Sequence, residues 1–327
     1  MTITADSQTI LLLCSHLGLP SDPDPAPLTR REWNPLARKI QASPLIRPES
    51  LLGLGVAELQ KELELNESEA TRLAVLLQRG EALEKELARL ASSGIHVLTR
   101  ADPEYPQRYR ERLKESAPLI LFYAGERALL GQPGIAVVGS RHLDQAGQEC
   151  ATFVGNACGL SGLVLYSGGA KGVDTISMNA ALEVRGTAVG VLAHSLEKTL
   201  RTPELRSALG RGDLCLVSPY SPNTGFSVGA AMGRNKLIYT LADYAIVVAS
   251  DANKGGTWSG AFETLKAGWV PVFILEHAAM PDGNRLLIEK GGRAFPHPFP
   301  EHYSKLADWL REHSGTIQTG PTQLGFF

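Results

Sequence analysis

The sequence predicts an α/β protein: an extended Rossmann-like, doubly wound and mostly parallel sheet, preceded by a small all-helical domain. The first observation is a change of composition after Gly94, where short apolar runs rich in Val, Ile and Ala begin. The second is that these runs are apolar on both faces and alternate with amphipathic stretches, as buried parallel strands require. The third is that glycines follow the runs, at the edge where such sheets bind ligands. The runs are 135–140, 163–169, 187–193, 214–218, 244–250 and 270–275.

The segment before the sheet shows a helical pattern. Leucines recur at helical spacing from about residue 28 to residue 90. Asn66 with Glu69 predicts a helix start, and Ser93-Gly94 predicts a stop. We therefore expect a small helical N-terminal domain over residues 1–95, with a proline-rich linker near residues 20–27. The Rossmann-like domain would cover residues 96–300, and residues 301–327 would form a short tail without a winged-helix domain.

The bulk composition limits the possible functions. A length of 327 residues favours one main domain plus a smaller one. The net charge of −2 gives no global attraction to polyanions, so phosphate binding must come from a local cluster and from backbone amides. No apolar run approaches the roughly 20 residues that span a bilayer. The four cysteines lack C-x-x-C spacing, which favours small buried residues and a reducing cytoplasm.

Two glycine-containing strand ends predict an anion-binding site. In the first, Gly139 allows a sharp turn into a helix that starts near Asp144, while Ser140 and Arg141 add a hydroxyl and a cation. A helix N-terminus presents unpaired N–H groups and partial positive charge to an anion. The second strand end supplies Ser167, Gly168, Gly169 and Lys171. Asp174, which follows, is expected to cap the next helix.

Three further segments could join the same edge of the sheet. Arg234, Asn235 and Lys236 could contact phosphates and a base edge together. Gly255, Gly256 and Thr257 form a glycine-rich turn before a helix, and a glycine turn over residues 282–288 leads into another. Trp258 could stack on a base or could be buried. Each segment alone has an ordinary structural explanation, and their convergence on one edge is the prediction.

Several common sites are missing from the sequence. There is no G-x-x-x-x-G-K-[ST] loop, and no G-x-G-x-x-G fingerprint follows the first strand. No group of Asp, Glu and His has metal-ligand spacing, which disfavours a metal nuclease. We expect no cofactor and no metal.

These residues resemble the DNA-processing protein A family, also called Smf. The resemblance covers about residues 100–296 and implies an extended Rossmann fold that binds single-stranded DNA, usual dimerisation, and loading of a RecA-type recombinase. The DNA pocket that it implies would use Ser140, Arg141, Ser167, Gly168, Lys171, Arg234 and Lys236. The matching segments are Asp102–Pro106, Ala117–Phe122, Val138–Arg141, Ser167–Asp174, Arg234–Lys236 and Gly283–Ile288.

The chain also departs from that family. Met178 stands where the family has histidine, and Ala231-Met232 replaces a phenylalanine–proline pair. The segment with Gly255 and Glu263 is similar to the wider superfamily of lonely-guy phosphoribohydrolases. Three alternatives remain open: a non-enzymatic DNA-binding protein, a nucleotide sensor or phosphoribohydrolase using Glu263 and Arg141, or a vestigial pocket beside a partner-recruiting helical domain.

Overall fold

The computed structural model describes residues 3–301 and 305–315. The described residues form two compact units, one up to Phe122 and one from Tyr123 onward. Strand β2 (Ile120–Gly125) contains the boundary.

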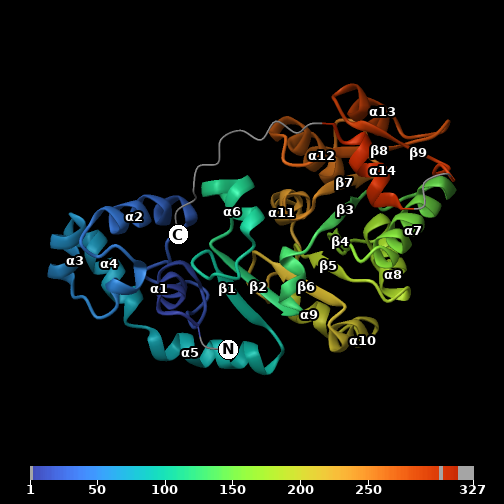
Figure 1. Ribbon diagram of the computed structural model, residues 1–327. Helices are drawn as coiled ribbons and strands as arrows, with labels where there is room; N and C mark the ends of the chain where they lie inside the picture. The colour runs from blue at the N-terminus through green and yellow to red at the C-terminus, as the bar shows by residue number, and fades with distance from the viewer. Residues whose placement is uncertain (1–2, 302–304, 316–327) are drawn as a thin grey trace. The chain divides into compact units, whose positions relative to one another are not determined.

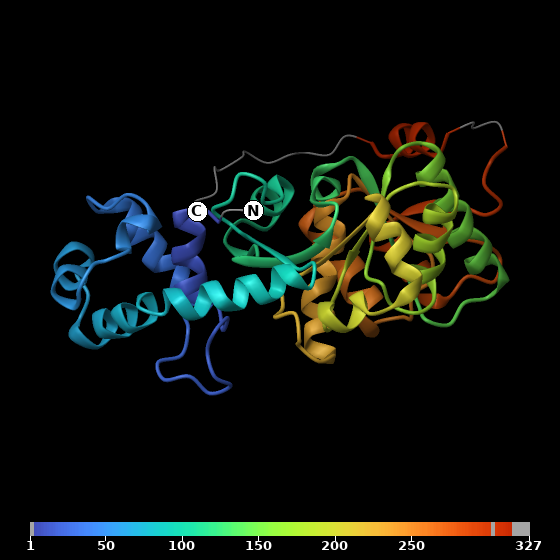
Figure 2. The same cartoon turned by 90° about the horizontal axis from the view of Figure 1, so that it is seen from below.

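The first unit is mostly helical, and its first five α-helices, coloured blue to cyan, lie together (Figures 1 and 2). The Asn66–Glu69 capping box starts α4, and Ser93 caps the end of α5, so both predicted helix boundaries are confirmed. Arg72 on α4 donates to the carbonyls of Ala26 and Pro27 in the proline-rich stretch. The elements are α1 (Ala5–Cys14), α2 (Arg30–Ala42), η1 (Pro48–Leu51), α3 (Val56–Leu63), α4 (Glu67–Leu77), α5 (Gly80–Ser92), β1 (His96–Thr99), α6 (Gln107–Leu113) and η2 (Lys114–Ser116), followed by the first half of β2.

The second unit contains the parallel sheet. Each of the six predicted apolar runs contains one strand, and the order is β6-β5-β4-β3-β7-β8-β9 with every registered neighbour parallel (Figure 1). The strand order reverses between β3 and β7, so the topological switch point lies there. The strands are β3 (Gly134–Val138), β4 (Val164–Ser167), β5 (Ala188–Val191), β6 (Leu214–Ser218), β7 (Tyr244–Val247), β8 (Val272–Glu276) and β9 (Arg293–Pro296).

Helices cover both faces of this sheet, as a doubly wound fold requires. Helix α7 packs on α8 and α11 packs on α12, and members of both pairs contact β3 (Figure 1). All residues of β3 are buried, which explains why that run is apolar on both faces. The helices are η3 (Arg127–Gly131), α7 (Gln145–Leu160), α8 (Val173–Glu183), α9 (Leu196–Leu200), α10 (Pro203–Arg211), α11 (Val228–Leu241), α12 (Gly255–Ala267), α13 (Asp282–Glu289) and α14 (Leu306–His313).

The cysteines are free, as the sequence predicts. Cys150, Cys158 and Cys215 are buried, while Cys14 is half-buried. Burial raises the pKa of the Cys150 and Cys158 thiols to about 12. Over the described ranges, no helix combines the length and the apolar character that crossing a lipid bilayer demands.

Helix α13 stabilises the carboxyl edge of the sheet. Its residues 282–288, expected from the sequence to form a glycine turn, are helical from Asp282 onward. Asn284 is fully buried, and its amide donates to the carbonyls of Val248 (3.0 Å) and Leu275 (2.9 Å). Its Oδ1 accepts the N–H of Ser250 at 2.9 Å. One side chain therefore satisfies three backbone groups after β7 and on β8.

Replacing Asn284 with alanine is expected to lower the free energy of unfolding by about 2–4 kcal/mol, because three buried backbone groups lose their partner. Urea denaturation measures the change. Asn179→Ala, at an exposed position of α8, is the matched control. A loss below about 1 kcal/mol for Asn284→Ala would contradict the bracing role.

Candidate phosphate-binding pocket

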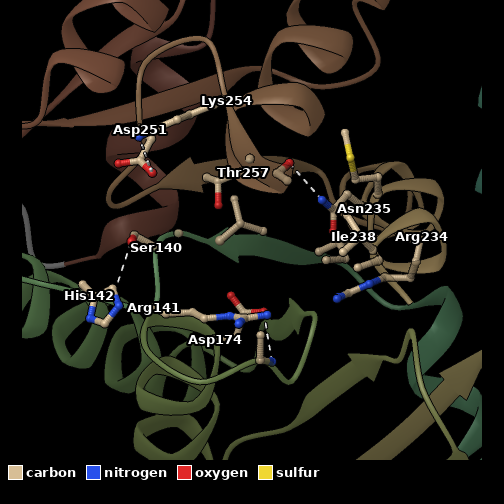
Figure 3. A pocket seen from close by; sticks show the side chains of 18 of the residues that line it. Ser140, Arg141, His142, Asp174, Arg234, Asn235, Ile238, Asp251, Lys254 and Thr257 are labelled. Carbon is tan, nitrogen blue, oxygen red and sulfur yellow. Dashed lines mark hydrogen bonds and ion pairs between the residues drawn. The ribbon is translucent and has the colours of Figure 1, made fainter. Parts of the chain in front are cut away.

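A pocket of about 510 Å³ opens at the carboxyl ends of β3 and β7, at the switch point of the sheet (Figure 3). Four of the five predicted segments contribute to it: the β3–α7 loop, the β4–α8 loop, helix α11 and the β7–α12 turn. The fifth, around Asn284, is not part of its lining. The lining residues are Val138, Gly139, Ser140, Arg141, His142, Ala170, Asp174, Phe226, Val228, Ala231, Met232, Arg234, Asn235, Ile238, Tyr239, Asp251, Lys254, Gly255, Gly256 and Thr257.

The β3–α7 loop forms one wall of the pocket. Gly139 is required there because a Cβ would lie 2.3 Å from Cγ2 of Val173. The backbone N–H of Ser140 donates to the carbonyl of Ala249, and the Ser140 hydroxyl accepts the N–H of His142. Arg141 is exposed and extends into the pocket (Figure 3). Asp144 caps α7, so the predicted helix start is confirmed.

The N-terminus of α12 forms another wall. Its first turn, Gly255 to Thr257, borders the pocket, and Lys254 occupies the N-cap position. Within the part of the chain that the structure describes, no side chain caps this 13-residue helix. Its first N–H groups and its positive dipole end therefore face the pocket, in the arrangement that stabilises bound anions.

Arg234 reaches the pocket from α11 and is only 6% exposed. It enters from the side opposite Arg141 (Figure 3). Gly168 makes room for it, because a Cβ at residue 168 would lie 1.7 Å from Nη1 of Arg234. Gly256 makes room for Asn235 in the same way, with a Cβ 2.6 Å from Nδ2, and that amide donates to the Gly256 carbonyl. These glycines thus position polar side chains of α11.

Asp174 does not cap α8, so that prediction is wrong. The helix starts at Val173 with Gly172 at the N-cap position, which places Asp174 in the first turn. Its carboxylate turns back instead and accepts the N–H groups of Gly168 (3.1 Å) and Ala170 (3.3 Å). Gly172, directly before the helix, has a φ of +89°, a backbone conformation that favours glycine. Asp174 is 6% exposed and borders the pocket.

Burial raises the pKa of Asp174, while Arg234 and the two amide N–H groups oppose the rise. Burial also lowers the pKa of His194, helped by Arg234 and Lys198, which keeps its ring neutral at pH 7. Arg234 therefore supplies the fixed positive charge among these three groups.

One side of the pocket is apolar and open. Phe226, Val228 and Met232 are 59%, 68% and 44% exposed, and all three line the pocket. They lie at the start of α11 and in the loop before it. The pocket thus combines a cationic and amide-rich wall with an apolar one, which suits a ligand that carries both phosphate and an unstacked base.

The sequence-predicted residues fall into two groups. Gly139, Ser140, Arg141, Arg234, Asn235, Gly255, Gly256 and Thr257 lie together in the lining. Outside it among the described residues are Ser167, Gly168, Gly169, Lys171, Lys236 and Glu263.

The second group has varied surroundings. Ser167 is fully buried, and its hydroxyl donates to the carbonyl of Val137. Gly169 and Lys171 are exposed on the β4–α8 loop, while Lys236 is half-buried on α11. Glu263 is exposed on α12.

Trp258 is buried at 7% exposure and stacks on Phe262, which confirms the structural alternative for it. Three features of the pocket were not predicted from the sequence: the apolar wall, Lys254 as a lining residue and the inward carboxylate of Asp174. Of these three features, only the position of Lys254 could have been inferred from the sequence, because this residue directly precedes the predicted glycine turn.

Comparisons with known proteins identify relatives of this chain. DNA processing protein DprA of Streptococcus pneumoniae is 32% identical over 183 residues, which cover 54% of this chain and 63% of that protein. DprA of Bacillus subtilis is 25% identical over 219 residues, covering 65% of this chain and 72% of the relative. The alignment with the pneumococcal protein thus spans less than two thirds of its length.

Solved structures show the same fold. The X-ray structure of DprA from Streptococcus pneumoniae superposes with a TM-score of 0.67 at 20% identity and covers 96% of this chain and 99% of that one. A structure of DNA processing protein A from Helicobacter pylori has a TM-score of 0.55 at 23% identity, covering 68% and 99%. The family model described as DNA recombination-mediator protein A matches residues 96–300, which are most of the chain and hold the whole pocket. The chain therefore belongs to the DNA recombination-mediator protein A family.

Proposed function

We propose that this chain is a DNA-processing protein that binds single-stranded DNA at the pocket between β3 and β7. The observation that carries the proposal is the meeting of Arg141, Arg234 and the uncapped start of α12 in one cavity. Guanidinium groups and helix N-termini are the groups that bind phosphates without reading sequence. The apolar wall at Phe226 offers unpaired bases a surface, which a duplex cannot use because its bases are stacked inside.

Relatives support this assignment. The Helicobacter pylori structure gives insight into the single-stranded DNA binding mode of DNA processing protein A from that organism. For this chain we extend the proposal to a homodimer that acts in the cytoplasm and hands DNA to a RecA-type recombinase, in transformation, recombination or defence. A pull-down with the recombinase of the same cell tests the handover, and sedimentation tests the dimer.

The DNA-binding proposal predicts a salt-dependent affinity for fluorescent oligo-dT. Each phosphate contact contributes a slope of about −0.7 in a plot of log K against log salt for single strands. Arg141→Ala should weaken binding several-fold and reduce the slope by about 0.7. The control is Arg206→Ala, on the exposed face of α10, which should change neither. No retention of oligo-dT at low salt would refute the proposal.

The second candidate is a nucleotide sensor or a nucleoside-monophosphate phosphoribohydrolase. The volume of about 510 Å³ is in the range of small-molecule pockets, which favours it. Glu263, its expected glutamate, is exposed on α12 and lies outside the pocket lining given by the described residues. Release of free base from nucleoside monophosphates, abolished by Glu263→Gln, would make the enzyme the better assignment.

A further inference from the structure

A buried carboxylate borders the pocket that we assign to phosphate. Asp174 lines it together with the two arginines, yet is 6% exposed (Figure 3). A carboxylate and a phosphate carry like charges, and their repulsion is strong where water is excluded. An acidic side chain at this place requires an explanation beyond general phosphate binding.

The hydrogen bonds of Asp174 show what it holds. The N–H groups of Gly168 and Ala170 both donate to the same oxygen, Oδ2. These amides belong to the glycine loop that the sequence predicts to bind the ligand, and Asp174 already accepts from them. The Asp174 carboxylate therefore accepts the loop N–H groups that a bound anion would otherwise accept.

Arg234 shares this environment. Its guanidinium lies against Gly168, where a Cβ would be 1.7 Å from Nη1 and 2.7 Å from Oδ2 of Asp174. Arg234 also opposes the rise that burial causes in the pKa of Asp174. A phosphate that binds Arg234 weakens this support and adds a negative charge, and both effects favour the protonated carboxyl group.

We propose that Asp174 is a positioning residue that acts through Arg234 as its resident counter-ion, and that the protein takes up a proton at Asp174 when DNA phosphate binds. The inference rests on the proposed function and deepens it. It predicts that the protein binds single-stranded DNA more tightly at acidic pH, because the Asp174 carboxyl group is then protonated.

Other charged and titratable groups face this site. Arg234 and Tyr239 come from α11, and Arg141 comes from the β3–α7 loop. His194 after β5 and Tyr220 after β6 lie within electrostatic reach of Arg234. Burial raises the pKa of both tyrosines, so they stay neutral over the physiological range. The lowered pKa of His194 places its protonation in acid, and the experiment must separate it from that of Asp174.

The sign of the linkage follows from the protonation states. At a pH below the pKa that Asp174 has in the DNA-free protein, the carboxyl group is neutral with or without DNA. The affinity for DNA is highest there. As the pH rises above 3.8, the ordinary pKa of an aspartate, Asp174 loses its proton first in the DNA-free protein. The affinity for DNA therefore falls. If bound phosphate raises the carboxyl pKa by about one unit, the total fall is about tenfold.

Asp174→Asn tests the proposal, because its Oδ1 can accept both amide N–H groups in place of Oδ2. Oligo-dT anisotropy between pH 5 and 9 should show the variant binding about tenfold more tightly than wild type at alkaline pH, with the two converging in acid. The ratio of the two curves removes the contribution of His194, which both proteins retain. Asp243→Asn, at the opposite edge of the sheet where Asp243 accepts the N–H of Gly134, is the matched control for charge.

Calorimetry in buffers of different ionisation enthalpy gives a second readout, which is the number of protons taken up on binding. Wild type should take up protons on binding oligo-dT, and Asp174→Asn should take up fewer. Equal uptake by both proteins, no uptake by wild type, or a variant that binds more weakly at every pH would each overturn the proposal. Absence of oligo-dT binding by wild type would instead remove the proposed function together with this inference.

Discussion

Replacing Arg234 with alanine is expected to weaken the binding of oligo-dT by roughly 30- to 150-fold, or about 2–3 kcal/mol. Arg234 is held inside the protein at 6% exposure, so its contact with phosphate is made where water competes poorly. Arg141, which is exposed, should contribute less for the same reason. Fluorescence anisotropy at fixed salt measures both losses.

The same substitution also affects folding. Without the guanidinium, the Asp174 carboxylate loses the opposite charge that supports it in a buried position. Breaking a buried charge pair costs about 3–5 kcal/mol. A loss of binding by Arg234→Ala could therefore arise from a loosened loop instead of a lost phosphate contact.

The double variant Arg234→Ala/Asp174→Asn separates these causes. Neutralising Asp174 should restore much of the free energy of unfolding, because no buried charge remains uncompensated. It should not restore DNA binding, because the cation is still missing. Recovery of both stability and binding in the double variant would show that Arg234 serves only the fold.

The fold was readable from the sequence because its strands are buried on both faces. Runs such as 244–250 contain no polar residue before their end, so each marks a parallel strand without help from periodicity. The strands β1, β2 and β9 were not predicted. β9, Arg293–Pro296, is half-exposed for three of its four residues and lacks an apolar run. Such strands are defined by their neighbours in the sheet.

The site was predictable at the glycine turns and not beyond them. A glycine beside a strand end indicates that another group packs closely against the backbone there. Gly139, Gly255 and Gly256 do line the pocket. What Gly168 approaches could not be read from the sequence, because Arg234 lies 66 positions further along the chain. The sequence predicts Asp174 as a helix cap, because aspartate near a helix start commonly caps the helix. Its actual partners depend on the path of the β4–α8 loop.

Gly168→Ala is expected to abolish most DNA binding without removing any group that contacts the ligand. The new methyl group would lie 1.7 Å from Nη1 of Arg234 and 2.7 Å from Oδ2 of Asp174. Both side chains are buried, so neither can move aside freely. We expect Arg234 to leave its position, an affinity loss of more than tenfold, and a drop of about 1–3 kcal/mol in the free energy of unfolding.

The control for this prediction is Gly210→Ala on α10. Among the described residues, no atom beyond its own helix turn and neighbours lies within 4 Å of a Cβ there, and its φ is not left-handed. Alanine at that position should leave binding unchanged and stabilise the helix by up to about 1 kcal/mol. Full oligo-dT affinity in Gly168→Ala would mean that the guanidinium position set by this glycine is irrelevant to the ligand. The DNA would then be held by Arg141, Lys254 and the start of α12 alone.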